Sequence, residues 1–373
     1  EIKENSMSVF TSMESKDHEQ LAFFQDSDTG LKAIVAIHDT TIGPALGGCR
    51  MWPYESEGDA LKDVLRLSRG MSYKAAIANL NLGGGKSVII GNSKTDKSET
   101  LFRSFGRFVE GLNGRYITAE DVGTSVKDME WVRMETQYVT GISRALGGSG
   151  DPSPVTAQGV FVGIKASVKK QLGKNSIAGL KVGVQGLGHV GYYLCKYLHD
   201  AGAKLVVADL YEPSIKRVVD EFNADVVGVD DIYDADVDIY APCALGATLN
   251  DETIPRLKAS IVAGAANNQL ENELVHDKMV CEKGILYAPD YAINAGGLIN
   301  VANEIDGYNR ERAFSQAEGI YDTLLTIFNL AEKENIGNQA AAAKVAEQRM
   351  TEVAKLKNIY LTRKNVMGKR DQT

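Results

Sequence analysis

A strand, a glycine-rich turn and a helix follow one another within residues 180–201, and this succession constrains the fold more than any other stretch of the chain. Residues 180–185 read as a strand, residues 186–191 read Gly-Leu-Gly-His-Val-Gly, and the helix follows. The next strand ends at Asp209. In this setting the glycines make a tight turn and let the backbone approach a pyrophosphate at the helix N-terminus. The segment predicts a dinucleotide-binding site; the alternative is an empty scaffold of the same kind.

Asp209 also predicts which dinucleotide binds. A carboxylate at this position accepts hydrogen bonds from the ribose hydroxyls of NAD and repels the 2′-phosphate of NADP. Leu210 and Tyr211 follow it, and neither is an arginine that would attract that phosphate. The predicted cofactor is therefore NAD. The cofactor-binding residues predicted from this segment are Gly186, Leu187, Gly188, His189, Val190, Gly191 and Asp209.

Strands and helices continue to alternate after this segment, which predicts a doubly wound parallel sheet of the Rossmann type. The expected strands are 236–242, 260–264 and 284–288, and the expected helices are 250–258 and 269–283. Two asparagine-containing loops, 264–268 and 290–298, each follow a strand. Loops at the carboxyl ends of parallel strands face the ligand crevice, so these loops are candidate binding segments.

Two lysines, Lys74 and Lys86, bracket an apolar and glycine-rich run that holds no other charge. The pKa of a lysine falls when the ammonium is desolvated or faces another cation, which makes the amine a usable base. The alternative is a salt-bridged lysine beside a glycine turn at residues 83–85. Residues 85–87 resemble the end of a P-loop, but the first glycine is missing and a strand follows, so nucleotide hydrolysis is excluded.

The rest of the first half predicts a second α/β region. Its expected strands are 31–38, 88–90 and 115–121, its helices are 59–69 and 99–112, and residues 41–50 are a glycine-punctuated loop. Gly70 is expected to end the first helix. Asp121, at the end of a strand, is either a carboxylate facing a cleft or the N-cap of the next helix. Long helices are expected at 311–334 and 338–357.

Length and composition bound the class of protein. A chain of 373 residues predicts two domains, and the glycine- and proline-rich stretch 147–154 reads as the hinge between them. The net charge of −8 argues against nucleic acid or an anionic membrane as a partner. The four cysteines are far apart, which indicates free thiols in a reducing compartment and no metal site. The charged start at residues 1–8 and the absence of a long apolar run predict a cytoplasmic protein.

Seven motifs in combination resemble the amino-acid dehydrogenase family of glutamate, leucine, valine and phenylalanine dehydrogenases. They read GPALGG, GMSYK, LGGGK, TAED, GLG, ANNQ and APDYAINAGG, at residues 43–48, 70–74, 82–86, 118–121, 186–188, 266–269 and 288–297. Within that family they are most similar to the leucine enzymes. The resemblance implies an enzyme that oxidatively deaminates an L-amino acid to a 2-oxo acid and ammonia while NAD accepts hydride.

The same resemblance implies roles for individual residues. Lys74 would bind the substrate carboxylate, Lys86 would be the general base that activates the attacking water, and Asp121 would shuttle protons and hold the amino nitrogen. Thr156, Asn267 and Asn294 would position nicotinamide and substrate. Other substrate-binding positions would be Leu46, Gly47, Ala119, Asn268, Leu298 and Val301. This pocket has no acid or base to suit a glutamate side chain.

The preferred side chain and the architecture complete the expectation. Leucine and other branched-chain amino acids are the predicted substrates; phenylalanine is the alternative, because Cys49, Gly85 and Leu298 are closer to the phenylalanine type. A protein of another class is also possible, a catalytically silent NAD-binding regulator.

The resemblance also implies an architecture of two domains with an active-site cleft between them. The substrate-binding and oligomerisation domain would comprise 1–148, completed by 338–373, and the NAD-binding domain would comprise 149–337. The assembly would be a homo-oligomer, either octamer or dimer.

Overall fold

The computed structural model describes residues 8–356, and backbone contacts divide them into two compact units. Unit 1 comprises residues 8–150, 301–309 and 347–356, and unit 2 comprises 151–300 and 310–346. The predicted boundaries differ from this division, because they placed 301–309 with the second domain and 338–346 with the first. The parts of the predicted first domain at 1–7 and 357–373 lie outside the described residues. Within 8–356, no helix has the length and apolar character needed to cross a bilayer.

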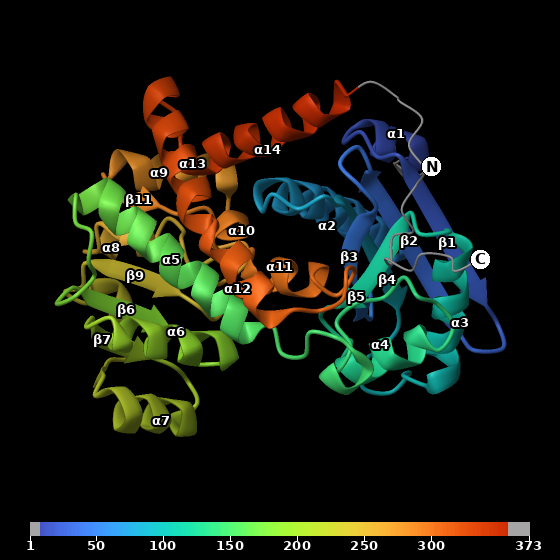
Figure 1. Cartoon of the computed structure of the whole chain (residues 1–373), viewed down its shortest axis with the longest axis horizontal. Helices are drawn as coiled ribbons and strands as arrows, with labels where there is room; N and C mark the ends of the chain where they lie inside the picture. Colours follow the sequence, from blue (N-terminus) through green and yellow to red (C-terminus); the bar gives the residue numbers. More distant parts are fainter. Residues whose placement is uncertain (1–7, 357–373) are drawn as a thin grey trace, which may run out of the picture. The chain divides into compact units, whose positions relative to one another are not determined.

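Unit 1 is built on a five-stranded mixed sheet in the order β1-β2-β4-β3-β5 (Figure 1). Its strands are β1 Gln20–Asp26, β2 Leu31–Asp39, β3 Ala45–Trp52, β4 Gly83–Ile90 and β5 Tyr116–Glu120. β2 pairs antiparallel with β1 and with β4, whereas β3 pairs parallel with β4 and with β5. The carboxyl ends of β3, β4 and β5 therefore lie at one edge of the sheet.

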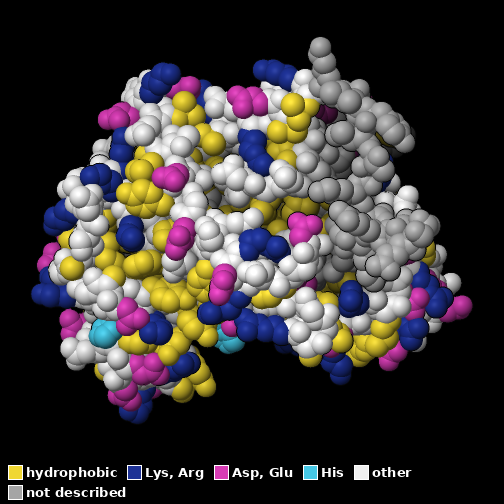
Figure 2. All heavy atoms as spheres, viewed as in Figure 1, with side chains coloured by type: hydrophobic (Ala, Val, Ile, Leu, Met, Phe, Trp, Pro, Cys, Tyr) yellow, Lys and Arg dark blue, Asp and Glu magenta, His cyan; other side chains and the backbone are white. Residues whose placement is uncertain are grey.

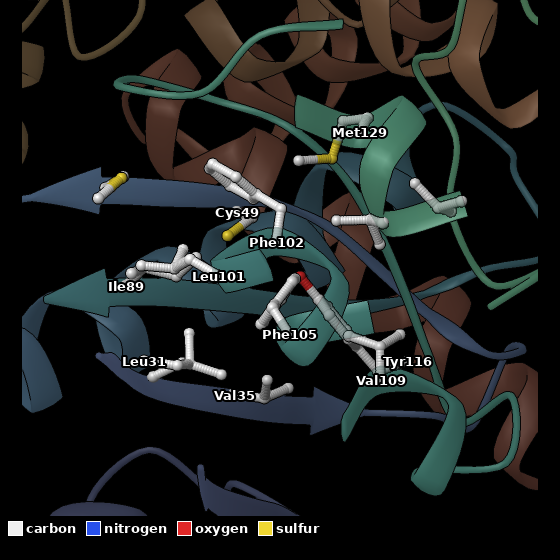
Figure 3. Packing of buried hydrophobic residues seen from close by; sticks show 14 of the residues in the cluster. Leu31, Val35, Cys49, Ile89, Leu101, Phe102, Phe105, Val109, Tyr116 and Met129 are labelled. Carbon is white, nitrogen blue, oxygen red and sulfur yellow. The ribbon is translucent and has the colours of Figure 1, made fainter. Parts of the chain in front are cut away.

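Helices cover both faces of this sheet. The helices of unit 1 are α1 Val9–Glu14, α2 Glu57–Ile77, α3 Glu99–Gly111 and α4 Val126–Arg133, with a 3₁₀ turn at Arg144–Leu146. Because side chains alternate along a strand, Leu31 and Val35 of β2 join the core under α3, whereas Ile34 and Ala36 pack under α2. Figure 3 shows the first of these cores, in which Phe105 and Tyr116 pack beside Val35.

Three local predictions for this unit are wrong. The helix expected at 59–69 does not end at Gly70 but continues to Ile77, because Ser72, Ala75 and Ala76 are buried against the sheet. The loop expected at 41–50 is mostly strand β3, and the glycine turn expected before Lys86 is the start of strand β4. Glycine weakens a strand when nothing else favours it, but close packing that leaves no room for a Cβ can require glycine within a strand.

Unit 2 is built on a six-stranded, fully parallel sheet in the order β11-β10-β9-β6-β7-β8. Its strands are β6 Lys181–Gln185, β7 Lys204–Ala208, β8 Asp225–Val226, β9 Ile239–Pro242, β10 Ile261–Val262 and β11 Leu286–Tyr287. The chain winds outward from β6 to one edge, then returns beside β6 and winds to the other edge. This order confirms the predicted doubly wound sheet, and its reversal lies between β6 and β9, where such folds bind ligands.

The helices of unit 2 complete the layers around its sheet. They are α5 Ser153–Leu172, α6 His189–Asp200, α7 Glu212–Phe222, α8 Thr253–Arg256, α9 Glu273–Glu282, α10 Asp290–Ile293, α11 Gly296–Ala302, α12 Arg310–Glu318 and α13 Ile320–Glu334, with a 3₁₀ turn at Asp231–Asp234. The loop expected at 290–298 is instead helical, as α10 and the start of α11. The single helix expected at 311–334 is two helices separated at Gly319.

The last helix, α14 Asn338–Ala354, begins in unit 2 and ends in unit 1. Its second half contacts the end of α2: the Tyr73 hydroxyl donates to Glu347 at 2.7 Å, and Arg349 donates to the carbonyl of Ala76 at 2.8 Å. The carbonyls of the last turn of a helix lack partners within the helix. Arg349 therefore fixes the turn of α2 that carries Lys74.

Charged side chains of both signs are interspersed on the face drawn in Figure 2. Several exposed pairs are helical neighbours four residues apart, such as Lys196 with Asp200 at 2.8 Å and Lys216 with Asp220 at 2.6 Å. Solvent screens such pairs, so they contribute little to stability. The less exposed ion pairs include several in unit 1, such as Lys86 with Asp121 and Lys97 with Asp128.

Candidate active site

A largely buried ion pair joins two of the predicted catalytic residues. Lys86 lies within β4, Asp121 follows the end of β5, and the Lys86 Nζ is 3.0 Å from the Asp121 Oδ2. The lysine side chain is 7% exposed and that of Asp121 is 22% exposed. Helix α4 is capped by Ser125 and Asp128, so Asp121 is not the N-cap that the sequence left as an alternative.

Arg50 extends this pair into a row of alternating charges. Its Nε donates to the same Oδ2 of Asp121 at 3.0 Å, and its Nη1 donates to Asp63 of α2 at 2.9 Å. The Tyr54 hydroxyl donates to Asp63 at 2.7 Å, and Arg66 reaches the other oxygen of that acid at 3.1 Å. A strand, a strand end and a helix are thereby joined through two carboxylates.

This arrangement decides the charge of Asp121. Burial by itself raises the pKa of Asp121, but the charges of Lys86 and Arg50 outweigh burial and hold the pKa below its usual value. The folded pKa thus lies below that of the unfolded chain, which is about 3.9. The resulting stabilisation is present above the unfolded pKa and is lost as pH falls through the folded value. Asp121 is therefore a carboxylate at neutral pH.

The sequence left two interpretations of Lys86 open, a lysine whose pKa falls in an apolar run and a salt-bridged lysine. The Asp121 carboxylate lies 3.0 Å from the Lys86 Nζ, so the salt-bridged alternative describes the observed geometry. A buried ammonium needs a counter-charge, and a neighbouring carboxylate stabilises it. Any role for Lys86 as a base therefore depends on how the negative charge of Asp121 is shared between Lys86 and Arg50.

The glycines around these residues are required by packing within unit 1. A Cβ at Gly47 would overlap the carbonyl of Gly85, and one at Gly48 would lie 2.8 Å from the Cβ of Asp121. The Tyr116 hydroxyl donates to the carbonyl of Gly47 at 2.6 Å. Gly48 thus lets Asp121 lie against β3. Approach of a ligand is not needed to explain either glycine.

The predicted substrate residues of unit 1 lie on two paired strands, on helix α2 and on helix α11. Leu46 and Gly47 of β3 pair with residues 117 and 118 of β5, and Ala119 pairs with Gly48. Leu46 and Ala119 are buried, at 1% and 7% exposure. Lys74 is partly buried on the last turn of α2. Val301 lies on α11, in the segment of unit 1 that follows residue 300.

The glycine loop of unit 2 has the form that a dinucleotide requires. Gly186 has a φ of +99° beside Ala244, and a Cβ at Gly191 would overlap the carbonyl of Gly186. Gly188 is different, because a Cβ there would meet nothing within 4 Å. It is the N-cap of α6. Packing does not explain Gly188, whereas close approach of a pyrophosphate to the helix N-terminus does.

Asp209 and the loop are tied together. The Asp209 carboxylate accepts the N–H of Leu187 at 2.5 Å and that of Tyr211 at 2.8 Å. These bonds hold the acid at the end of β7 beside the loop after β6, where an adenosine ribose would lie. His189 and Val190 form the first turn of α6. The residues present therefore fit NAD.

Replacing Asp209 by serine is expected to weaken NAD binding by roughly 10–10²-fold, since a hydrogen bond to a charged group contributes about 1.5–3 kcal/mol. The same change should relieve the exclusion of NADP, because a carboxylate repels a phosphate. Titration of each dinucleotide against the protein measures both effects. Asp200→Ser, which removes an acid from the end of α6, is the matched control. If the unaltered protein binds NADP as well as NAD, Asp209 does not select the cofactor.

Three more predicted residues cluster in unit 2. Asn294 is 4% exposed and donates to the side chain of Asn267 at 2.7 Å and to the carbonyl of Ala265 at 3.1 Å. Thr156 of α5 lies against α11, where a Cβ at Gly297 would be 3.0 Å from its hydroxyl oxygen. Asn294 and Asn267 thus form a hydrogen-bonded pair, and Thr156 lies beside the helix that follows Asn294.

Two other predicted residues flank this group. Asn268 is exposed, has a φ of +52°, and accepts the N–H of Ala247 through its carbonyl at 2.7 Å. Leu298 is 6% exposed on α11. The backbone of Asn268 thus shapes the loop after β10, and its side chain is accessible.

Arg50 and Asp63 were missed at the sequence level. Arg50 stands in the run Ala-Leu-Gly-Gly-Cys-Arg-Met-Trp, where every other residue is apolar or glycine. A lone charge in a buried strand requires a partner, and that was the signal available. Asp63 carried no signal, because it lies on the polar face of a helix.

Comparison with known proteins gives a consistent result. Residues 18–138 match the family model described as Glu/Leu/Phe/Val dehydrogenase, dimerisation domain, and residues 147–211 and 211–364 match Glutamate/Leucine/Phenylalanine/Valine dehydrogenase. A leucine dehydrogenase from Thermoactinomyces intermedius is 58% identical over 95% of this chain and 97% of its own length. A phenylalanine dehydrogenase from Bacillus thermotolerans is 47% identical over 96% and 95%.

A solved structure agrees with these matches. The crystal structure of L-tryptophan dehydrogenase from Nostoc punctiforme has a TM-score of 0.85 and 49% identity, and the match covers 93% of this chain and 100% of that one. The matches confirm the predicted fold class, the predicted enzyme class and NAD as the cofactor. Because family models match both halves of its length, the chain belongs to the glutamate/leucine/phenylalanine/valine dehydrogenase family.

Proposed function

We propose that this chain catalyses the NAD-dependent oxidative deamination of L-leucine and other branched-chain L-amino acids to the 2-oxo acid, ammonia and NADH. The observation that carries the proposal is the buried Lys86–Asp121 pair. This pair places an amine and a carboxylate side by side. Oxidative deamination needs both, because protons leave the substrate nitrogen and the attacking water. The identity of 58% to a leucine dehydrogenase supports the choice of reaction.

In the proposed mechanism each side chain has one task. Lys74 binds the substrate carboxylate, Asp121 accepts a hydrogen bond and a proton from the amino nitrogen, and Lys86 deprotonates the water that attacks the substrate iminium carbon. Among residues 8–356, the Asp121 Oδ2 receives Lys86 and Arg50, whereas its Oδ1 receives no protein donor. Oδ1 is thus the oxygen available to the substrate. Bound NAD supplies the hydride acceptor, and Thr156, Asn267 and Asn294 orient it.

The choice of branched-chain substrates rests on the residues expected to line the side-chain pocket. Leu46, Ala119, Leu298 and Val301 are all apolar, which suits an aliphatic side chain and offers no charge to glutamate. Cys49 was one reason to consider phenylalanine, but it is fully buried in the core beside Phe102 (Figure 3). A Cβ at Gly85 would be 2.7 Å from the Tyr116 ring, so packing accounts for that glycine.

A substrate panel tests the proposal. NADH formation is measured with leucine, valine, isoleucine, phenylalanine, tryptophan and glutamate under the same conditions. The highest kcat/KM is expected for a branched-chain amino acid and the lowest for glutamate, because a charged side chain in an apolar pocket is left without a partner. A preference for phenylalanine or tryptophan would overturn the side-chain assignment. Cofactor binding without turnover of any amino acid would favour the silent regulator.

The assembly and cellular setting are part of the proposal. We infer a homo-oligomer, either octamer or dimer, in which residues 1–148 and 338–373 take part in oligomerisation and substrate binding and 149–337 bind NAD. The description of the model that matches 18–138 as a dimerisation domain supports this. We also infer a cytoplasmic enzyme of branched-chain amino-acid catabolism. Sedimentation of the full chain measures the oligomer.

A further inference from the structure

We propose that Arg50 is a positioning residue for catalysis, which holds Asp121 in place and takes up part of the negative charge that Lys86 would otherwise face alone. This inference rests on the proposed function, because it assigns Lys86 as the base. It goes further because it names Arg50 as the group that allows Lys86 to act as a base although Lys86 is paired with Asp121.

The geometry places both cations on one oxygen. The Lys86 Nζ and the Arg50 Nε are each 3.0 Å from the Asp121 Oδ2. A guanidinium stays charged at every pH at which an enzyme works. Arg50 therefore permanently neutralises part of the carboxylate charge, which weakens the hold of Asp121 on the Lys86 ammonium. It also fixes the carboxylate through the same oxygen, Oδ2, that Lys86 contacts.

Arg50 is itself held in place from the opposite side. Its Nη1 binds Asp63, and the Tyr54 hydroxyl donates to the same oxygen of Asp63. The guanidinium thus divides its charge between Asp121 and Asp63. Asp63 therefore also affects Lys86, and its effect opposes that of Arg50. It draws part of the positive charge of Arg50 away from Asp121, which leaves Asp121 more negative toward Lys86.

The other groups near Lys86 are neutral or are paired with a different residue. Cys49 of β3 and Tyr116 of β5 face the same side of the sheet as Ser87, the neighbour of Lys86 on β4. Burial raises the pKa of the Cys49 thiol to about 12 and raises that of the Tyr116 phenol as well, so both stay neutral. Ser87 binds the Tyr116 hydroxyl. The next acid, Asp128, is paired with Lys97 at 2.5 Å. Within residues 8–356, ion pairs join Lys86 to Asp121, Asp121 to Arg50 and Arg50 to Asp63 in one row.

The test compares the kcat–pH profiles of Arg50→Gln and Asp63→Asn with that of the unaltered enzyme. Without Arg50, Asp121 carries an undivided negative charge beside the base, so the acid limb of the kcat–pH profile should move to higher pH. A fall in kcat of roughly tenfold at neutral pH, recovered as pH rises, is the expected size, because a limb displaced by about one pH unit changes the rate tenfold. Without Asp63, Arg50 serves Asp121 alone, so the acid limb should move to lower pH.

Two further variants separate positioning from stability. Arg103→Gln is the matched control, because Arg103 of α3 also bridges two carboxylates, Glu99 at 3.1 Å and Glu135 at 2.6 Å, and these belong to a separate cluster from Asp63 and Asp121; its profile should be unchanged. Arg50→Lys restores the charge and should return the acid limb toward its original position, even if kcat stays low. Thermal melting of each variant reports stability independently.

Each outcome decides the proposal. Opposite shifts for Arg50→Gln and Asp63→Asn support it. Loss of kcat or of thermal stability without any shift of the acid limb shows that Arg50 is only structural, and shifts of the same sign contradict the sharing of charge. If Arg50→Gln does not fold, the sign of the Asp63→Asn shift alone decides. Failure of the proposed function is distinct: the unaltered enzyme would then turn over no branched-chain amino acid.

Discussion

Lys86→Ala is expected to lower kcat by about 10²–10⁴-fold at neutral pH, the usual range for a general base. NAD binding should be unchanged, because Lys86 lies in unit 1 and the glycine loop lies in unit 2. A small primary amine added to the solution should restore part of the activity, since the truncation leaves space beside Asp121. The measurement is kcat against pH for both forms, with dinucleotide titration.

Lys97→Ala is the matched control for this change. Lys97 is also a lysine of unit 1 paired with a largely buried carboxylate, at 2.5 Å from Asp128, but it precedes Ser98, the N-cap of α3. Its loss should affect stability and leave kcat within a few-fold. Lys74→Ala should mainly raise KM, because a lost carboxylate contact weakens substrate binding. A near-normal kcat with an unchanged acid limb in Lys86→Ala would show that Lys86 is not the base.

Gly84→Ala is expected to destabilise unit 1 by about 1–3 kcal/mol or more, as overpacking of a close contact does. A Cβ at Gly84 would overlap the backbone nitrogen and hydroxyl of Ser72, in the C-terminal half of α2. Backbone atoms cannot move aside as a flexible side chain can. Helix α2 would therefore be displaced from β4, and the turn that carries Lys74 would move away from the strand that carries Lys86.

Gly70→Ala is the opposite case on the same helix. Gly70 is exposed within α2, and a Cβ there meets nothing within 4 Å. Alanine should stabilise the helix by about 0.5–1 kcal/mol. Denaturant unfolding followed by circular dichroism should thus show shifts of opposite sign for the two variants. Equal effects of both would contradict the tight packing of α2 on β4.

The sequence by itself determined most of unit 2 and the chemistry of the chain. The glycine loop, the strand before it and Asp209 were predicted because each is a local pattern: a tight turn needs glycine, and a parallel strand buried on both faces is apolar throughout. The parallel sheet followed from the alternation of strands and helices. Lys86 and Asp121 were identified because a family motif preserves residue types at fixed positions along the chain.

Tertiary structure alone decided what surrounds those residues in unit 1. Glycines 83–85 read as a turn, but they form a strand because Asp39, Ser72 and Tyr116 approach them where any Cβ would collide. Gly70 read as the end of a helix, but burial of the residues after it continues the helix. The two cations on one oxygen of Asp121 come from strands β3 and β4, which pair only in the folded chain. Local patterns report the preferences of neighbouring residues, whereas the charge of a buried group depends on residues brought together from far apart in the sequence.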